Sequence, residues 1–228
     1  MSTRLPTGCA ALDDLLGGGV ERGTITEFFG EAGSGKTNLC LVLARNVAHA
    51  GKKAIYIDTE GLSLERLFQI CGGNIDRPRA EASMKLVFVF EAHDFDEQEE
   101  AVNKAISLAE KLEDVDLIVL DSLAAHYRRH FGTDEESRAR QRLGLIVTRL
   151  LRCARTRSLP VVVTNQVFTD IDADSFEPLG GHAVSHTAKA IIRLARVAPN
   201  RRRATVEKHR SVAEGGSAEF TLTADGIR

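Results

Sequence analysis

The sequence is poor in the residues that build disulfide frameworks and zinc sites. Its 228 residues include 4 cysteines, scattered along the chain without any Cys-x-x-Cys pair. Zinc sites and disulfide scaffolds need a recognisable cysteine spacing, so this pattern argues against both. Cys40 and Cys153 fall on helical patterns and are expected to be small apolar fillers. Proline and glycine form no linker-like stretch, so residues 1–228 are expected to form a single domain.

Long apolar runs are also missing. No run approaches the roughly 18 residues that a membrane span needs. Arg4, Asp13 and Asp14 interrupt the region where a signal peptide would need an apolar stretch. We therefore expect a soluble, cytoplasmic protein with no membrane partner.

Positive charge is scarce in the first half of the chain. Residues 1–127 contain 12 Lys and Arg against 21 Asp and Glu, whereas residues 128–228 contain 18 against 11. The positive residues of the second half are mostly arginines, clustered in 128–157 and 189–210. Clustered arginines suit contact with phosphate groups. A solvated Arg-rich surface without a partner is the alternative that charge alone leaves open.

Apolar runs alternate with helical patterns along most of the chain. The runs at 24–29, 53–58, 85–90, 116–121 and 161–165 predict buried strands, and the patterns at 38–44, 64–71, 94–112 and 135–157 predict helices. Residues 204–210 and 217–222 predict strands of a C-terminal antiparallel edge, and 188–197 fits a strand or a helix. This alternation predicts an α/β fold with a mostly parallel central sheet covered by helices on both faces.

A glycine-rich loop follows the first of these strands. It consists of Gly30, Glu31, Ala32, Gly33, Ser34, Gly35, Lys36 and Thr37. The spacing is that of a P-loop, in which backbone N–H groups curl around phosphates, the lysine reaches the β and γ phosphates, and the hydroxyl holds Mg²⁺. The helix that follows would direct its N-terminus at the same anion. Strand, loop and helix together predict a nucleotide-binding site.

Carboxylates close two of the other predicted strands, at the edge where parallel sheets bind ligands. Asp121 directly follows Leu-Ile-Val-Leu, where a P-loop enzyme has the Walker B acid that orients Mg²⁺. A helix N-cap is the alternative for Asp121. Glu60, in Asp-Thr-Glu-Gly, is predicted to orient and deprotonate the water that attacks the γ phosphate. Asp58 competes for that role or is a structural, capping residue.

An amide closes the strand at 161–165. Gln166 could hydrogen-bond a γ phosphate and move when the phosphate leaves, which would make it a sensor coupled to the loop at 168–182. A buried capping amide is the alternative. The sequence has no Asn-Lys-x-Asp motif for reading guanine, so ATP is preferred over GTP.

Taken together, these residues resemble the core of the RecA/RadA recombinase family, and above all its short archaeal paralogues. The matching stretches are 7–12, 16–20, 25–37, 56–61, 117–122, 127–128, 139–141, 163–167, 180–182 and 225–226. They run in order through essentially the whole chain, which is far more specific than a P-loop alone. The resemblance implies a RecA-like ATPase core.

The resemblance also implies cofactors and residue roles. ATP and Mg²⁺ would be bound, and Lys36, Thr37, Glu60, Asp121 and Gln166 would have the roles argued above. Residues 126–134 and 168–182 match the two DNA-binding loops of the family, and Arg66 matches a position that stacks on adenine. Lys208 and Arg210 resemble cations that such ATPases insert into a neighbour's site, although a charged edge strand is an equal alternative.

Two departures from the family set limits on the expected activity. The match begins at the first residues, so we expect no N-terminal helical DNA-binding domain and no Phe-containing docking motif. Residues 168–182 contain Asp170, Asp172, Asp174 and Glu177 and no Lys or Arg, so this loop should repel a phosphodiester backbone.

Positive charge is kept elsewhere, in the first loop and in one later run. Arg128, Arg129, Arg201, Arg202 and Arg203 are therefore expected to contact DNA in a salt-dependent way and without sequence specificity.

These expectations favour an ATP-binding, DNA-binding accessory protein of recombination and repair, with weak ATPase activity and no strand exchange. Its expected partners are DNA, a RadA-type recombinase and a Holliday-junction nuclease. The alternatives are a DNA-stimulated ATPase or recombinase that assembles through another surface, and a KaiC-like signalling ATPase, since Leu16-Gly-Gly-Gly-Val20 before a P-loop also occurs there.

Overall fold

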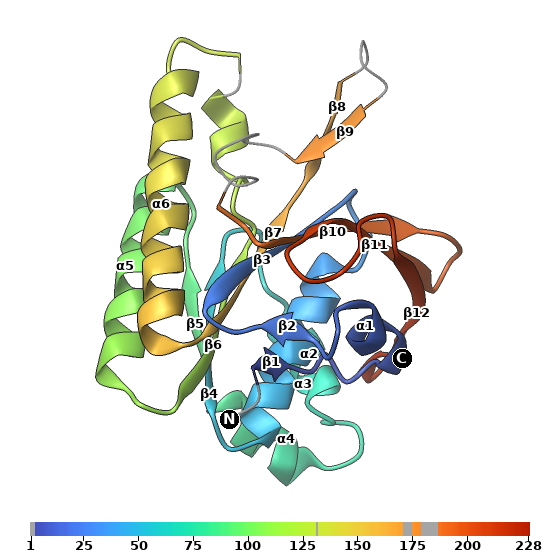
Figure 1. Cartoon of the computed structure of the whole chain (residues 1–228). Coiled ribbons are helices and arrows are strands. Elements are labelled where there is room, and N and C mark those ends of the chain that lie inside the picture. Colours follow the sequence, from blue (N-terminus) through green and yellow to red (C-terminus); the bar gives the residue numbers. More distant parts are fainter. Residues whose placement is uncertain (1–2, 131, 171–174, 179–186) are drawn as a thin grey trace.

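The structure is a computed structural model that describes residues 3–130, 132–170, 175–178 and 187–228, without the side chains of 168–170 and 175–178. Its centre is a 9-stranded sheet (Figure 1). In sheet order the strands are β13 (Gly226–Ile227), β12 (Ser217–Thr223), β11 (Arg201–His209), β10 (Ala190–Arg196), β3 (Thr24–Phe29), β7 (Pro160–Asn165), β6 (Val115–Asp121), β4 (Lys53–Asp58) and β5 (Val87–Glu91).

The strands from β10 to β5 are parallel, and β11, β12 and β13 add an antiparallel edge. The predicted fold class is therefore confirmed. The ambiguous segment 188–197 contains strand β10, which is hydrogen-bonded to β3 on one side and β11 on the other. Ile191 and Ile192 face opposite sides of the sheet and are both buried, so the strand belongs to the core.

Helices cover both faces of the sheet (Figure 1). One face carries α1 (Ala10–Leu15), α2 (Lys36–His49), α3 (Leu64–Ile70) and α4 (Arg77–Met84), and the other carries α5 (Phe95–Lys111) and α6 (Glu136–Arg157). Each face buries its own apolar cluster, because successive residues of a strand point to opposite sides. Cys40 in α2 and Cys153 in α6 are buried and free, as expected for small fillers. No helix among the described residues is long and apolar enough to cross a membrane.

Short polar side chains begin three of these helices. Ser63, Asp76 and Asp94 accept hydrogen bonds from backbone N–H groups three residues further on, at the starts of α3, α4 and α5. Such caps satisfy N–H groups that have no partner within the helix. Helix α6 ends at Ser158, whose φ of 53° stops the helix before β7.

Several short elements were not predicted from the sequence. They are α1, α4, the β1–β2 pair (Arg4–Leu5 with Val20–Glu21), the 3₁₀ helix η1 (Tyr127–His130), β13 and the hairpin of β8 (Val167–Asp170) with β9 (Ser175–Pro178). The hairpin projects beyond the main sheet on the side where β7 ends (Figure 1). It occupies part of the predicted second DNA-binding loop, and the rest of that loop, including Gly180, Gly181 and His182, lies outside the described residues.

Candidate nucleotide-binding site

The order of the central strands brings the predicted site residues together. Strands β3, β7, β6 and β4 are neighbours and parallel, so their carboxyl ends lie side by side. The P-loop follows β3, Gln166 follows β7, Asp121 ends β6, and Glu60 follows β4. Residues that are far apart in the sequence thus share one edge of the sheet, as the rule for parallel α/β sheets predicts.

The P-loop is held closely against the neighbouring strand β10. A Cβ atom at Gly30 would lie 2.1 Å from the carbonyl oxygen of Leu194, so only glycine fits there. The Gly30 N–H donates to the carbonyl of Asn165 at 3.3 Å. At the other end of the loop, Gly35 has a φ of 101° and caps helix α2. The loop therefore passes directly from a buried strand to a helix N-terminus.

Lys36 lies inside the P-loop and faces the acidic end of the site. Its ammonium donates to the carbonyl oxygens of Gly30 at 2.8 Å and Glu31 at 2.9 Å. Burial lowers the pKa of Lys36, and the charges of Glu60 and Asp121 raise it. These interactions place the cation between the phosphate loop and the carboxylates.

Asp121 is a buried carboxylate surrounded by hydroxyl groups. Tyr56 donates to its Oδ2 at 2.6 Å and Thr164 donates to its Oδ1, and the hydroxyl of Thr37 lies nearby. Burial raises the pKa of Asp121, and the hydroxyl groups of Thr164, Tyr56 and Thr37 lower it. The two predicted magnesium ligands, Thr37 and Asp121, therefore lie close together. Both offer oxygen, the ligand atom that Mg²⁺ prefers.

Glu60 lies at the exposed rim of the site and is held by two donors. Ser122 Oγ donates to its Oε1 at 2.7 Å, and Gln166 Nε2 donates to the same oxygen at 2.8 Å. Asp58, the competing candidate, instead accepts hydrogen bonds from the backbone N–H groups of residues 60–62. Asp58 therefore shapes the turn that carries Glu60.

Gln166 connects the carboxylate to the first predicted DNA-binding loop. While its Nε2 donates to Glu60, its Oε1 accepts from Nη1 of Arg128 at 2.8 Å. The three side chains come from the ends of β4 and β7 and from η1. They form one continuous chain of hydrogen bonds from the predicted general base to an exposed arginine.

Comparison with known proteins now decides the family. A model of the Rad51 family matches residues 2–228. The chain belongs to the Rad51 family. The RecA-like fold and the family resemblance carried by the sequence motifs are thus confirmed.

Individual relatives are similar over nearly their whole length. The chain is 48% identical over 228 residues to "DNA repair and recombination protein RadB" of Halobacterium salinarum, covering 99% of this chain and 94% of that protein. It is 45% identical over 226 residues to the protein of the same name from Methanococcoides burtonii, covering 99% and 97%. A solved structure described as "Crystal structure of the RadB recombinase" superposes with a TM-score of 0.82 at 34% identity and covers 98% of each chain.

Arg66, matched by resemblance to an adenine-stacking position of the family, is firmly anchored. Its guanidinium donates to Oδ1 of Asn38 at 2.8 and 2.9 Å and to the carbonyls of Thr223 and Ala224 at 2.7 Å. These bonds tie α3 to the P-loop helix and to the C-terminal turn. They fix the plane of the guanidinium, and stacking on adenine remains a prediction.

The arginine run at 201–203 does not form the free basic surface that its sequence suggested. Arg202 is 6% exposed, and its Nε donates to the Gly33 carbonyl of the P-loop at 3.0 Å. Arg201 and Arg203 are exposed but both pair with Glu219, because β12 lies beside β11 in register. The prediction of DNA contact is therefore corrected for Arg202, which is structural. Glu219 offsets the charge of Arg201 and Arg203, and DNA contact by these two exposed arginines stays a prediction.

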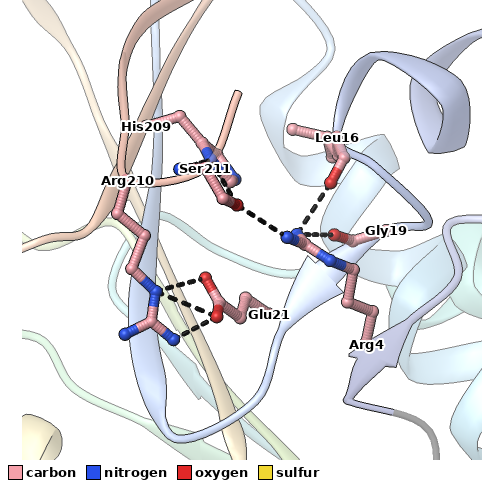
Figure 2. Close-up of polar contacts among 7 residues, drawn as sticks. All are labelled: Arg4, Leu16, Gly19, Glu21, His209, Arg210 and Ser211. Atoms are coloured by element: carbon pink, nitrogen blue, oxygen red, sulfur yellow. Dashed lines mark hydrogen bonds and ion pairs between the residues drawn. The ribbon is translucent and has the colours of Figure 1, made fainter. Parts of the chain in front are cut away.

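The two cations at the end of β11 lie near carboxylates of their own chain. Figure 2 shows Arg210 paired with Glu21 of β2, beside Arg4, which donates to the Leu16 carbonyl at 2.7 Å and to Ser211 Oγ at 2.9 Å. Lys208 lowers the pKa of the buried Glu27, which shows that it lies near that carboxylate. Both cations thus have electrostatic partners within the chain, and a role in a neighbour's site stays a prediction.

Several residues that build this Rad51-family site were not singled out from the sequence. Tyr56 and Thr164 hold Asp121, Ser122 holds Glu60, and Asn165 contacts the P-loop. Each is a polar residue within or directly after an apolar strand. That pattern was a usable signal, but sequence alone does not show which strands are neighbours in the sheet.

Proposed function

We propose that this protein binds ATP with Mg²⁺, hydrolyses it slowly, binds DNA, and assists recombination without carrying out strand exchange. The observation that carries the ATP part of the proposal is that Lys36, Asp121 and Glu60 meet at one edge of the sheet beside a complete P-loop, and the acidic composition of 168–182 supports the absence of strand exchange. Rad51 and RecA proteins are ATPases, and the relatives of this chain are named DNA repair and recombination proteins.

The nucleotide would be bound by charges and backbone donors that the fold already holds in place. Lys36 would leave the carbonyls of Gly30 and Glu31 for the β and γ phosphates. Thr37 and Asp121 would hold Mg²⁺, which supplies positive charge at the phosphates. A buried carboxylate such as Asp121 is costly without a cation, and a bound Mg²⁺ would offset that cost.

Hydrolysis would depend on Glu60, which would orient the attacking water and accept its proton. Its Oε1 already accepts hydrogen bonds from Ser122 and Gln166, so Oε2 is the oxygen left for water. When ATP is bound, Gln166 would release Glu60 and hydrogen-bond the γ phosphate instead. Because these groups must rearrange before a reactive geometry forms, turnover should be slow.

DNA contact would centre on the first loop and continue along α6. Arg129 is exposed, and its side chain has no hydrogen bond or ion pair with any described residue. Arg138, Arg152 and Arg155 on α6 are also exposed and unpaired within the described part of the chain. By contrast, the acidic composition of 168–182 should repel phosphates, which supports DNA binding without strand exchange.

The nucleotide site is tested by binding and turnover in matched variants. Lys36→Ala should lose ATP binding, whereas Glu60→Gln should keep ATP affinity within about 3-fold and lose turnover by a factor of about 100 or more. Glu65→Gln, an exposed carboxylate on α3, is the control and should behave as wild type. Unchanged ATP affinity in Lys36→Ala would refute the site.

The DNA surface is tested by two variants that remove the same charge. Arg129→Ala should weaken binding to single-stranded DNA several-fold and reduce the dependence of affinity on salt by about one ion. Arg203→Ala should have little effect, because Glu219 already pairs with that guanidinium. If both variants weaken binding equally, net charge and not the loop determines affinity.

A second function is favoured by one contact. Arg128 lies in the first DNA loop and bonds the predicted sensor Gln166 directly, so DNA that captures Arg128 would release Gln166 for the γ phosphate. That arrangement suits a DNA-stimulated ATPase or recombinase. The effect of DNA on turnover separates the two functions.

The proposed protein partners are a RadA-type recombinase and a Holliday-junction nuclease, and the names of the relatives support only the wider setting of DNA repair and recombination. Strand exchange by a RadA-type recombinase should change in rate or extent when this protein is added. The protein alone should give no exchange product. An exchange reaction that is insensitive to this protein would contradict the accessory role.

A further inference from the structure

Glu27 is a carboxylate in the middle of the sheet that the proposed chemistry does not use. It lies in β3, opposite Val163 of β7 and Ile191 of β10, and is 0% exposed. Its Oε1 accepts a hydrogen bond from Nδ2 of Asn165 at 3.0 Å. Its Oε2 has no hydrogen-bond partner among the described residues. Since both neighbours in its row are apolar, a leucine or methionine at this position would cost less free energy to bury than a carboxylate.

Asn165 links this carboxylate to two parts of the nucleotide site. Its Oδ1 accepts from the backbone N–H of Gln166 at 2.9 Å, and its carbonyl accepts from the N–H of Gly30 at 3.3 Å. The first bond fixes the backbone position of Gln166, from which its side chain extends. The second holds the end of β7 against the start of the P-loop. Asn165 is 0% exposed, so water does not replace these partners.

Glu27 favours one of the two orientations of the Asn165 amide. An asparagine side chain offers a donor at one end and an acceptor at the other. The backbone N–H of Gln166 must face the amide oxygen of Asn165. The carboxylate of Glu27, at the opposite end, can accept a hydrogen bond only from the amide NH₂ group. Without Glu27 the amide could rotate by half a turn and present its NH₂ group to the Gln166 N–H. Two donors would then face each other, and the first residue after β7 would have to shift.

The charge of Glu27 is partly balanced. Lys208 of β11 lies two strands away in the same row of the sheet, since Ile191 is opposite both Glu27 and Lys208. Burial raises the pKa of Glu27, the hydrogen bond from Asn165 and the charge of Lys208 lower it, and the net result is a pKa of about 7. This arrangement keeps an acceptor at Glu27 whether or not the carboxyl carries a proton.

We propose that Glu27 and Asn165 are positioning residues that fix the backbone of Gln166 relative to the P-loop. This inference rests on the proposed function, in which Gln166 reaches Glu60 and the γ phosphate. Glu27 and Asn165 are both 0% exposed, so neither would touch a bound nucleotide. They act through Gln166, whose side chain can contact Glu60 at 2.8 Å only while its backbone stays in place.

The test compares two substitutions of Glu27 in the full chain. Glu27→Gln keeps an acceptor for Asn165, and Glu27→Leu removes it while fitting the apolar row. We expect Glu27→Leu to lower kcat for ATP about 10-fold or more with KM changed less than about 2-fold, because misplacement of a catalytic group affects the rate more than ground-state binding. Glu27→Gln should restore kcat to within about 3-fold of wild type. Glu27→Met replaces Glu27→Leu if that variant fails to fold.

A second readout needs neither nucleotide nor turnover. Hydrogen exchange of the Gln166 backbone amide should accelerate in Glu27→Leu and stay at the wild-type rate in Glu27→Gln. Equal exchange in all three proteins, an unchanged kcat in Glu27→Leu, or an equal loss of kcat in both variants would overturn the inference. If the wild-type protein turns over no ATP, the proposed function fails, and the exchange of Gln166 alone then decides whether Glu27 positions it.

Discussion

At the scale of single residues, the buried hydroxyl groups around Asp121 matter most for the site. Tyr56 is 0% exposed and donates to Asp121 at 2.6 Å. Tyr56→Phe removes that donor without opening a cavity and leaves a buried carboxylate with one partner fewer. We expect the free energy of unfolding to fall by about 1–3 kcal/mol, measured by urea denaturation.

The matched control for this prediction is Tyr127→Phe. The Tyr127 hydroxyl donates at 3.0 Å to Glu136, which is only partly buried. Its removal should cost about 1 kcal/mol or less. A smaller loss in Tyr56→Phe than in Tyr127→Phe would show that Asp121 does not depend on the Tyr56 hydroxyl.

Glu27 should leave a signature in the dependence of stability on pH. Its pKa is raised by burial from 4.5 to about 7 in the folded protein, so folding favours the protonated form. The resulting stabilisation is complete below about pH 4.5 and is lost as the pH rises through about 7. Relative to Glu27→Gln, the wild-type protein should therefore lose about 3 kcal/mol of unfolding free energy across that range. Parallel pH profiles of the two proteins would contradict the assignment.

The sequence predicted the residues that would act on the nucleotide better than the residues that hydrogen-bond them. Lys36, Thr37, Glu60, Asp121 and Gln166 all lie at one edge of the sheet, as expected. Their roles follow from spacing within single motifs, which sequence shows directly. The supporting contacts join residues from different strands, so they depend on a strand order that sequence did not give.

At the scale of elements, the N-terminal β1–β2 pair is fastened to the end of β11 (Figure 2). Arg210 is half-exposed where it pairs with Glu21, and ion pairs at such positions contribute little to the free energy of unfolding. Arg210→Ala should therefore lower unfolding free energy by about 1 kcal/mol or less and leave ATP turnover unchanged. Thermal unfolding and steady-state turnover measure the two effects.

The same variant decides between two roles for Arg210. If Arg210 acts on a neighbour's nucleotide, Arg210→Ala should reduce turnover strongly at protein concentrations where copies associate. Glu21→Gln is the matched control, because it frees Arg210 from its own carboxylate but keeps the cation. Loss of turnover in Arg210→Ala but not in Glu21→Gln would support the role in a neighbour's site.

Long elements were predictable and short ones were not. Helix α6 was expected at 135–157 and spans Glu136–Arg157, and β4 has the bounds expected for it, Lys53–Asp58. Both have sustained apolar patterns with clear polar ends. The β1–β2 pair is formed by two-residue strands, too short for any pattern, and β10 was ambiguous because its apolar residues are buried on both faces.

At the scale of the whole molecule, the positive charge of the second half of the chain is less available than its sequence suggests. Arg201 and Arg203 pair with Glu219, Arg210 pairs with Glu21, and Arg202 donates a hydrogen bond to a P-loop carbonyl. Unpaired arginines lie instead on η1 and α6, as at Arg129 and Arg152 in the described part of the chain. DNA should therefore contact η1, at the carboxyl ends of the strands, and continue along α6 toward the amino end of β7.

The direct test of the account is steady-state ATP turnover with and without single-stranded DNA, in the wild-type protein and in Glu60→Gln. The account predicts slow turnover that DNA does not accelerate and that Glu60→Gln abolishes. Strong stimulation by DNA that is lost in Glu60→Gln would contradict it. In that case the Arg128–Gln166 contact would be the trigger of a DNA-stimulated recombinase.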